Sequence, residues 1–373
     1  AIVGAGPVGV SLALALCGSG RRVVLLDARG AAVNDRRAIA LSFGTRLFFE
    51  RLGVWSALMA TPIESIHVSQ RGGFGRTLLT AAQCGRPALG YVCSYADLHG
   101  TLNAALRDAA DITLVQPAKV EALDGESGAK TLSVRTEDRL ATLHARLVVL
   151  ADGGALAGSL TRQVVRDYAQ SALIATLSCD TAHHNRAYER FTPDGPMALL
   201  PNGADFALVW TLPSERGKHM LEEDDAHFLA QAQAAFGTRA GGFLAVRERG
   251  LYPLALRFVT HIDQDGVIAL GNASQTLHPV AGQGLNLGLR DAAALSECIR
   301  HGTGDSHLAA LSRRFARTRA GDRIGTIALT DLLASAFSND IAPMRALRAC
   351  GLALLDILPP AKRAFADRMM FGA

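Results

Sequence analysis

The first 27 residues divide into short apolar runs that are separated by glycines. Residues 1–3 are typical of the end of a buried strand, and the apolar run 10–17 has the length and composition of a helix. A Gly-Ser-Gly segment at 18–20 ends that helix, and residues 23–26 predict a second buried strand that closes on Asp27. The pattern therefore predicts a strand–helix–strand unit at the start of the chain.

The following stretch mixes strand-like and helix-like segments. Residues 63–80 alternate apolar and polar positions around the glycines at 72–75, which predicts a hairpin. Leucines four residues apart predict a helix over 97–110. Further strands are expected at 119–123, 132–136 and 145–150.

From residue 168 to residue 256 the strand–helix alternation disappears. Strands are expected at 171–178, 197–200 and 204–212, with one helix at 222–236, which predicts a mostly antiparallel lobe. A buried strand at 267–270 then leads through a glycine-rich loop into a helix that ends at Arg300. The remaining chain is expected to be helical, over 312–337 and 344–358.

These elements predict an α/β protein in the α+β two-lobe sense, with a Rossmann-like nucleotide-binding lobe and a mostly antiparallel β-sheet substrate lobe. A length of 373 residues exceeds what one core usually holds, so two lobes are expected. The nucleotide-binding lobe is expected to be discontinuous. The expected boundaries are 1–62, 82–165 and 257–340 for the nucleotide-binding lobe, 63–81 and 166–256 for the substrate lobe, and 341–373 for a carboxyl-terminal helical segment.

Composition narrows the class of protein. Hydrophobic residues make up 49% and charged residues 19% of the chain, so an ordered, folded protein is expected. A net charge of +4, dispersed along the chain, is too small to indicate nucleic-acid binding. The 6 cysteines show neither a Cys-x-x-Cys pair nor metal-ligand spacing, which favours reduced thiols, no metal site and a cytoplasmic protein. No apolar run reaches the length that spans a membrane.

Gly4, Gly6 and Gly9 place a G-x-G-x-x-G motif between the first strand and the first helix. In a dinucleotide-binding turn the first glycine permits the tight turn, the second lets the backbone approach the pyrophosphate, and the third lets the helix pack on the strand. The helix start adds free N–H groups and a positive dipole end. Asp27 lies where a carboxylate accepts hydrogen bonds from ribose hydroxyls. This context favours dinucleotide binding over a merely tight turn.

Two later turns also follow buried strands. Asp152-Gly153 lies at the carboxyl end of strand 145–150, where ligands bind in open α/β sheets, although an Asp-Gly pair also makes plain turns. The loop that begins at Gly271 leads into a helix, so its amino end is a second candidate anion site. The apolar residues around the glycines of this loop argue against a plain surface loop.

Basic residues indicate two further contacts. Arg36 and Arg37 follow the second strand, and they lie either beside the phosphates or in a solvated loop. The carboxyl-terminal helices either lie on a membrane as a basic amphipathic surface or pack on the nucleotide-binding lobe with solvated arginines. Their basic residues are Arg313, Arg314, Arg317, Arg319 and Arg323, expected on one side of a helix, and Arg345, Arg348, Lys362, Arg363 and Arg368.

Three separated segments together resemble the single-component flavin aromatic hydroxylases of the p-hydroxybenzoate hydroxylase-like superfamily. They are GAGPVG with Asp27, ADGG at 151–154 and GNASQTLHPVAGQGLNLGLRD at 271–291. Within that superfamily, DRRAIALS at 35–42, ALGYV at 88–92 and ERFTPDGPMALLP at 189–201 are similar to the ubiquinone-biosynthesis hydroxylases. The similarity covers nearly the whole chain, and it is greatest to the polyprenyl-methoxyphenol hydroxylases that oxidise the ring position para to the phenol oxygen.

The resemblance implies FAD as the cofactor. It assigns Asp27 to the adenosine ribose, Arg37 to the cofactor beyond the first helix, and Asp152 with Gly153 to the flavin pyrophosphate and, indirectly, to NAD(P)H. Asn272 stands where most relatives carry the aspartate that holds the ribityl chain, and an amide can still accept and donate there. The residues implied to bind FAD are Gly4, Gly6, Gly9, Asp27, Arg37, Asp152, Gly153, Asn272, Gly282, Gln283, Gly284, Leu285 and Asn286, with Pro279 beside the flavin ring.

The resemblance also implies the reaction. Flavin reduced by NAD(P)H reacts with O2 to form a flavin hydroperoxide, and a polyprenyl phenol intermediate of ubiquinone biosynthesis attacks its distal oxygen. His278 and Pro279 are the candidate catalytic residues. As a base, His278 competes with the interpretation that it is hydrogen-bonded within its own loop.

Three alternatives remain at this point. They are a related flavin monooxygenase that acts on another phenol or alkene, an NAD-dependent dehydrogenase, and a non-enzymatic FAD-binding subunit. The late loop at 271–291 argues against the dehydrogenase, which needs no second cofactor cradle. Because a polyprenyl phenol is insoluble, we expect weak peripheral attachment to the inner membrane or association with a ubiquinone-biosynthesis complex.

Overall fold

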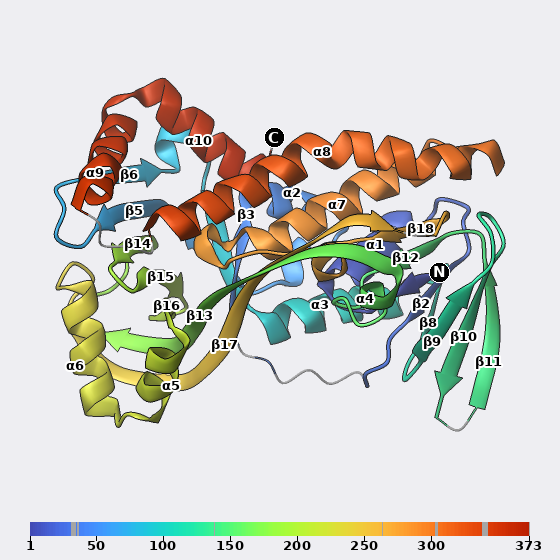
Figure 1. The fold of residues 1–373 in the computed structure, drawn as a ribbon, viewed down its shortest axis with the longest axis horizontal. Helices are drawn as coiled ribbons and strands as arrows, with labels where there is room; N and C mark the ends of the chain where they lie inside the picture. The colour runs from blue at the N-terminus through green and yellow to red at the C-terminus, as the bar shows by residue number, and fades with distance from the viewer. Residues whose placement is uncertain are drawn as a thin grey trace.

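The protein is described here by a computed structural model that covers residues 1–30, 35, 37–137, 139–262, 264–302, 305–337 and 342–372. A parallel sheet lies at one end of the elongated molecule and a large antiparallel sheet at the other, and two long strands run between them (Figure 1). This arrangement confirms the predicted fold class, a Rossmann-like nucleotide-binding part with a mostly antiparallel second sheet.

The parallel sheet has five strands in the order β18–β12–β1–β2–β8. Its two faces pack against different layers, because successive residues of a strand point to opposite sides of the sheet. Ile2 faces a layer of helices that includes Leu12 of α1, whereas Val3 faces the small antiparallel sheet that contains Leu132. The strands are Ile2–Val3 (β1), Val23–Leu26 (β2), Ile112–Val115 (β8), Val148–Leu150 (β12) and Val267–Ala269 (β18), and the small sheet is Lys119–Asp124 (β9), Lys130–Thr136 (β10) and Arg139–Ala145 (β11).

Three helices pack on the first face of the parallel sheet: α1 (Pro7–Leu16), α3 (Tyr95–Arg107) and α7 (Gln283–Arg300). Ser94 begins α3 as a capping residue, since its hydroxyl accepts a hydrogen bond from the Asp97 N–H at 2.9 Å. A small three-stranded sheet of β3 (Ala38–Ser42), β7 (Gly90–Ser94) and β4 (Thr61–Ile63) lies between the two main sheets, and helix α2 (Phe43–Arg51) directly follows β3 in the chain.

The antiparallel sheet has eight strands in the order β19–β17–β13–β16–β15–β14–β5–β6, with one parallel pair between β14 and β5. Helices α5 (Ser214–Glu222) and α6 (Asp225–Phe236) bury one of its faces around Trp210. The strands are Ser65–Gln70 (β5), Arg76–Thr80 (β6), Thr161–Cys179 (β13), Arg186–Thr192 (β14), Gly195–Asn202 (β15), Asp205–Pro213 (β16), Phe243–Ile262 (β17) and Gln275–Thr276 (β19).

Strands β13 and β17 are much longer than the sequence pattern predicted. They contain 19 and 20 residues and pair from Thr161 with Ile262 to Cys179 with Phe243. Their paired ladder extends from the edge of the nucleotide-binding part into the centre of the antiparallel sheet (Figure 1). The two halves of the molecule are therefore joined by continuous sheet.

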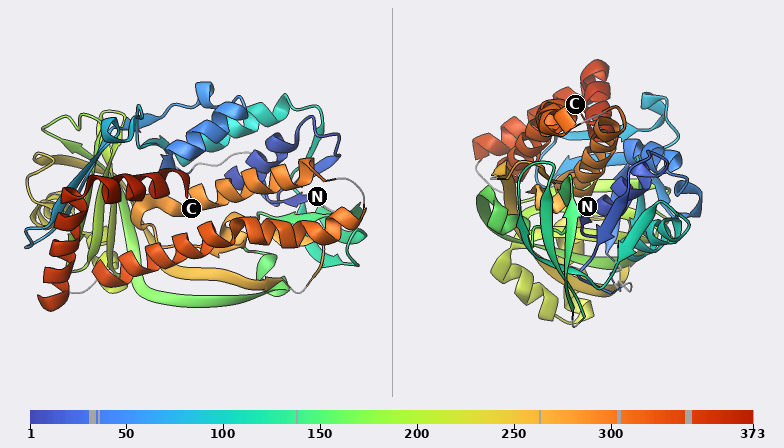
Figure 2. Two further views of the ribbon diagram at one scale, coloured as in Figure 1. Left: turned by 90° about the horizontal axis from the view of Figure 1, so that it is seen from above. Right: turned by 90° about the vertical axis from the view of Figure 1, so that its right-hand side faces the viewer.

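The described chain from Gln283 onward is helical, as predicted. Helix α8 (Asp305–Phe337) runs along α7 for much of its length (Figure 2), whereas α9 (Ala342–Ile357) packs on strand β6 and α10 (Pro359–Phe371) packs on α2. The short helix α4 (Ala157–Leu160) completes the set. In the part of the chain that the structure describes, no helix combines the length and the apolar character needed to cross a membrane.

Candidate functional site

The glycine motif forms a tight turn between β1 and α1. Gly4 has a φ of +107°, a backbone conformation that residues other than glycine rarely adopt. A Cβ on Gly9 would overlap the Gly4 carbonyl oxygen. A Cβ on Gly6 would have only the Tyr95 hydroxyl nearby, at 4.0 Å, so the space beside Gly6 is open. The three glycines thus have the three geometries expected of a dinucleotide-binding turn.

The amino end of α1 is available to an anion. Gly6 is the residue that begins the helix, no side chain caps it, and its first turn carries no acidic residue. The first backbone N–H groups of a helix have no intrahelical partners, so they point out of the helix end together with its positive dipole. This is the arrangement that binds phosphate groups.

Asp27 lies at the end of β2, beside the same turn. Its carboxylate accepts hydrogen bonds from the Ala5 N–H at 2.6 Å and the Arg29 N–H at 2.8 Å, and the side chain is buried. A carboxylate has about four acceptor positions, so a ribose hydroxyl can be added without displacing these bonds. Asp27 therefore fits the ribose position while it also stabilises the turn.

The Asp152-Gly153 corner lies next to the glycine turn, since a Cβ on Gly4 would overlap Ala151 at the end of β12. The Asp152 carboxylate accepts hydrogen bonds from the Gly154 N–H at 3.0 Å and the Leu156 N–H at 2.5 Å. Asp152 thus has the turn-forming role that was the plain alternative, and a role toward a cofactor stays a prediction. Gly153 has a φ of +78° and open space around it.

The late loop, residues 271–291, lies beside both the glycine turn and the Asp152-Gly153 corner. A Cβ on Gly154 would be 3.5 Å from the backbone oxygen of Asn272, and one on Gly271 would meet Val8 of α1 at 3.1 Å. The Asn272 side chain is exposed. Segments around residues 4, 152 and 272 are therefore brought together, although they lie far apart in the sequence.

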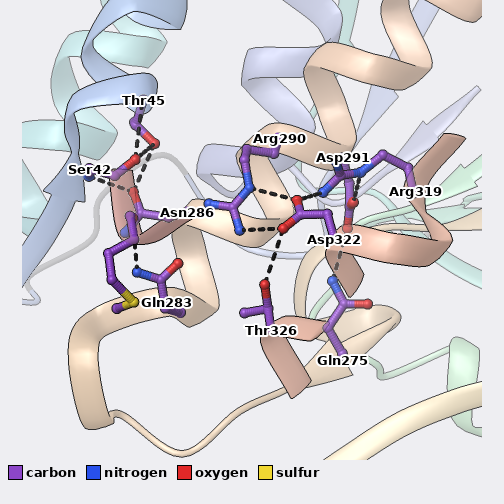
Figure 3. Close-up of polar contacts among 11 residues, drawn as sticks. Ser42, Thr45, Gln275, Gln283, Asn286, Arg290, Asp291, Arg319, Asp322 and Thr326 are labelled. Carbon is purple, nitrogen blue, oxygen red and sulfur yellow. Dashed lines mark hydrogen bonds and ion pairs between the residues drawn. The ribbon is translucent and has the colours of Figure 1, made fainter. Parts of the chain in front are cut away.

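Helix α7 also begins without a cap. Gly282 precedes it with a φ of +61°, no side chain caps the helix, and its first turn carries no acidic residue, so the N–H groups of Gly284 and Leu285 are left for a ligand. The Gln283 side chain itself is buried and donates a hydrogen bond to the Met369 carbonyl oxygen of α10 at 3.2 Å (Figure 3). The last helix thus contacts the loop directly.

Asn286 fixes strand β3 against α7 (Figure 3). Its Nδ2 donates to the carbonyl oxygens of Ala40 at 2.9 Å and Gly282 at 2.7 Å. Its Oδ1 accepts from the Ser42 N–H and the Thr45 hydroxyl, both at 2.8 Å. All four hydrogen-bonding positions of the side chain are used within the protein, so only the backbone of Asn286 is left for a cofactor.

Arg37 lies at the start of β3 and pairs with Asp35, with its Nε 2.8 Å from the carboxylate. Its guanidinium stacks on the Tyr252 ring at 4.7 Å and lies 5.8 Å from the centre of the Tyr95 ring, whose hydroxyl is beside Gly6. Arg37 therefore lies between the glycine turn and the antiparallel sheet. Arg36 lies outside the described residues.

His278 is buried in the late loop. Its Nδ1 accepts a hydrogen bond from the Val280 N–H at 3.2 Å, and its ring meets the Tyr168 ring edge-on at 5.3 Å. Burial lowers the pKa of His278 to about 4, so the ring is neutral at physiological pH. This geometry supports the interpretation of a histidine bonded within its loop, and a catalytic role for His278 or for its neighbour Pro279 stays a prediction.

A buried ion-pair network behind α7 was not predicted (Figure 3). Asp291 accepts hydrogen bonds from Gln275 of the late loop at 2.9 Å and from Arg319 of α8 at 2.6 Å. Asp322 pairs with Arg319 and, at 2.8 Å, with Arg290. Burial acts to raise the pKa of Asp322, but these two arginines outweigh it and hold the pKa below its usual range. The network fixes the late loop to α8.

The expectation that the arginines of 312–337 share one side is wrong. Arg313, Arg314 and Arg317 are exposed, whereas Arg319 is buried in the network and Arg323 donates to the Val259 carbonyl oxygen at 2.7 Å. Each residue advances an α-helix by about 100°, which places the second group roughly opposite the first. Only the first group is solvated.

The site fits a dinucleotide with a second ring system. Two uncapped helix ends and three glycine-rich turns converge, and Gly4, Gly153 and Gly282 at these turns all have a positive φ. Residues 1–311 match the protein-family model described as "FAD binding domain". The chain belongs to this family. It therefore binds FAD.

Characterised relatives carry the assignment further. The chain is 33% identical to the protein named ubiquinone hydroxylase UbiL of Rhodospirillum rubrum, over 99% of this chain and 88% of that protein. It is 30% identical to the 3-demethoxyubiquinol 3-hydroxylase of Escherichia coli, over 94% of this chain and 93% of that enzyme. These relatives identify the chain as an FAD-dependent aromatic monooxygenase.

The fold has solved counterparts. The p-nitrophenol 4-monooxygenase PnpA of Pseudomonas putida superposes with a TM-score of 0.80 at 17% identity, over 100% of this chain and 97% of that one. Klebsiella pneumoniae HpxO, in a complex with FAD and uric acid, gives a TM-score of 0.75 at 17% identity, over 100% of this chain and 96% of that one. At this identity the likeness shows the fold alone.

Proposed function

We propose that the protein hydroxylates the aromatic ring of a polyprenyl phenol intermediate of ubiquinone biosynthesis, with NAD(P)H and O2. The observation that carries the proposal is similarity over most of the chain to two hydroxylases, one named for ubiquinone and one for 3-demethoxyubiquinol. Because those relatives bear different names, the ring position is a separate question. The para position suggested by the sequence motifs remains the specific form of the proposal.

Bound FAD, once reduced by NAD(P)H, supplies an oxygen atom from O2 in electrophilic form. The chain binds and orients the cofactor. The amino end of α1 holds the pyrophosphate, Asp27 the adenosine ribose, and Asn272 the ribityl chain. The N–H groups of Gly284 and Leu285 stabilise negative charge on the ring system by fixed dipoles.

The test of this proposal uses the purified, FAD-loaded protein and a prenylated methoxyphenol with a short tail. NAD(P)H oxidation that the phenol stimulates, with a product heavier by one oxygen atom, supports the proposal. Cells that lack the protein should accumulate the polyprenyl phenol that is its substrate. Turnover of small soluble phenols only, with no ubiquinone intermediate accumulating, would contradict it.

We also propose weak peripheral attachment to an anionic membrane, which would deliver an insoluble substrate. The basic carboxyl-terminal residues expected above do not support this attachment, because Arg348 is buried and Lys362 is buried in an ion pair with Asp356 at 2.7 Å. Instead, α9 carries an exposed apolar stripe at the spacing of one helix face. The stripe consists of Leu347, Leu354 and Ile357, and Leu358 continues it immediately after the helix.

The turn between β5 and β6 adjoins α9, since a Cβ on Gly75 would overlap Ala349. Its tip presents Phe74, which is 72% exposed, between the exposed Arg71 and Arg76. An aromatic ring between two cations beside an apolar helix face matches the surface of an anionic bilayer.

Flotation with anionic vesicles tests the attachment. We expect Phe74→Asp with Leu354→Asp to reduce the floated fraction and Leu140→Asp, an equally exposed change at the opposite end of the molecule, to leave it unaltered. Point variants are preferable to truncation, since removing α10 also removes the Gln283 contact. Equal flotation of all three proteins would refute the attachment.

A further inference from the structure

The two faces of the antiparallel sheet differ in accessibility. The face toward α5 and α6 is closed: Leu173, Leu199, Leu208 and Trp210 are at most 1% exposed. Residues of the opposite face stay partly accessible along one row that crosses the sheet in register. The row consists of Val68, Glu189, Ala198, Val209, Ile174 and Gly250.

This open face is directed at the cofactor region. The neighbours of Glu189 on the same side of β14 are Ala187 and Phe191, because side chains alternate along a strand. Ala187 packs against Val92 of β7, and Phe191 packs against Val280 of the late loop.

Strand β3 makes a third contact near Glu189. Strand β3 meets the late loop, since a Cβ on Gly282 would be 3.1 Å from the Ala40 side chain, and β3 also meets the sheet where Ala38 packs beside Ala187. Glu189 therefore lies within a triangle formed by the sheet, β3 and the loop that opens α7. The Glu189 side chain faces the start of α7, the last segment whose backbone is assigned to FAD.

Glu189 is the one ionisable residue of this otherwise apolar row. In the described chain it has neither a hydrogen bond nor an ion pair, and burial alone raises its pKa to about 7. Two charged groups on the surrounding elements have other partners: Arg37 pairs with Asp35, and Asp331 of α8 with Arg166 and Tyr168. His278 is neutral. A carboxyl group without a partner in such a place is costly unless a ligand supplies the partner.

We propose that Glu189 accepts the hydrogen bond of the substrate's phenol group and acts as its proton acceptor, an inference that rests on the proposed function. As a ring carbon bonds to the electrophilic oxygen atom, the bond that held this oxygen in its donor breaks and the donor keeps that electron pair. At the same time the phenol O–H bond breaks, its electron pair passes into the ring, and the proton forms a new O–H bond on the Glu189 carboxylate. The ring carbon that has received oxygen then loses its hydrogen as a proton to water. When aromaticity returns, Glu189 gives its proton back to the phenol oxygen.

The apolar part of the row suits the rest of the ligand. Val68, Ala198, Val209 and Ile174 offer no hydrogen-bonding side chain, so a phenol ring that lies on them finds a partner for its one hydrogen-bond donor only at Glu189. The apolar residues of the row therefore orient the phenol ring, and Glu189 accepts its proton.

Calorimetry provides a test that does not depend on turnover. Binding of a short-tailed prenyl methoxyphenol at pH 6, where Glu189 is largely protonated, should release about one proton per ligand, because the phenol requires the carboxylate. The release should vanish at pH 9. Glu189→Gln should release none at either pH, whereas Glu189→Asp retains the release. Equal release from wild type and Glu189→Gln would overturn the proposal.

Kinetics provide the second test. We expect kcat/KM of the FAD-loaded wild type to rise with pH through about 7, and Glu189→Gln to lose that limb and to lower kcat about 10²–10⁴-fold. Glu215→Gln, on α5 beyond the closed face, should match wild type. An unchanged profile in a variant that binds FAD normally overturns this inference alone. A wild type that oxidises no phenol overturns the proposed function itself.

Discussion

Replacing Glu189 by glutamine should make the protein more stable at alkaline pH. Burial raises the pKa of Glu189 from its ordinary 4.5 to about 7. Below pH 4.5 the carboxyl is protonated in both the folded and the unfolded chain, so it affects stability equally at all such pH values. Between pH 4.5 and 7 only the unfolded chain ionises, and stability falls; above pH 7 the decline is complete.

The size of the effect follows from the interval between the two pKa values. At about 1.4 kcal/mol per pKa unit, an interval from 4.5 to about 7 corresponds to about 3 kcal/mol, and water that reaches the carboxylate reduces this value. Glutamine has nearly the same shape and does not ionise. The variant should therefore gain up to about 3 kcal/mol over wild type on going from pH 4.5 to pH 8.5.

Urea unfolding of wild type and Glu189→Gln at the two pH values measures this difference, and other titrating groups cancel because both proteins share them. Glu215→Gln serves as the control and should show no pH-dependent gain. A stability difference that does not change with pH would refute the reasoning, since it would mean that Glu189 ionises as freely in the folded chain as in the unfolded one.

Three further changes test the cofactor region. Gly9→Ala should abolish FAD binding, measured by flavin absorbance, because its Cβ would overlap the Gly4 carbonyl oxygen. Asp322→Ala should lower the free energy of unfolding by about 3–5 kcal/mol, since it leaves Arg290 buried without its partner. Asn286→Ala should cost about 1–3 kcal/mol for each buried group left unsatisfied, and should weaken FAD binding by releasing β3.

Matched controls keep these outcomes specific. Gly100→Ala adds the same methyl group in the middle of α3, where a Cβ meets nothing within 4 Å, and should bind FAD as wild type does. Asp367→Ala removes an exposed carboxylate from α10 and should leave unfolding within about 0.5 kcal/mol. Normal FAD content in Gly9→Ala, or an Asp322→Ala protein as stable as Asp367→Ala, would contradict the corresponding argument.

The glycine turns were predictable because their requirements are local. Gly4 and Gly9 are required by backbone conformation and by close packing within one strand–helix unit, so their spacing alone carries the information. The glycine at 282 likewise precedes a helix with no cap. The convergence of these turns was predicted only through the family resemblance, because it depends on strand order in the sheet.

The long strands and the carboxyl at Glu189 were not predictable in the same way. Much of β17 was missed because it includes a glycine, Pro253 and several charged residues, and its tertiary pairing with β13 outweighs those local preferences. The motif that contains Glu189 was recognised, but whether its side chain faces α6 or the cofactor depends on register. The sequence also could not show that Arg319 is buried while Arg317 is exposed, because this depends on which face of α8 packs on α7.

The paired ladder of β13 and β17 has a mechanical consequence. A hinge needs a few residues that can absorb a change in backbone angles, and near its middle the ladder offers them where its register shifts, between Asp167 and Gln170 and between Ile174 and Thr176. Bending along these strands would therefore be concentrated between Asp167 and Gln170, where Ala169 has a φ of +53°. The paired segments on either side of that point would then move as two stiff pieces, one with the nucleotide-binding part and one with the antiparallel sheet.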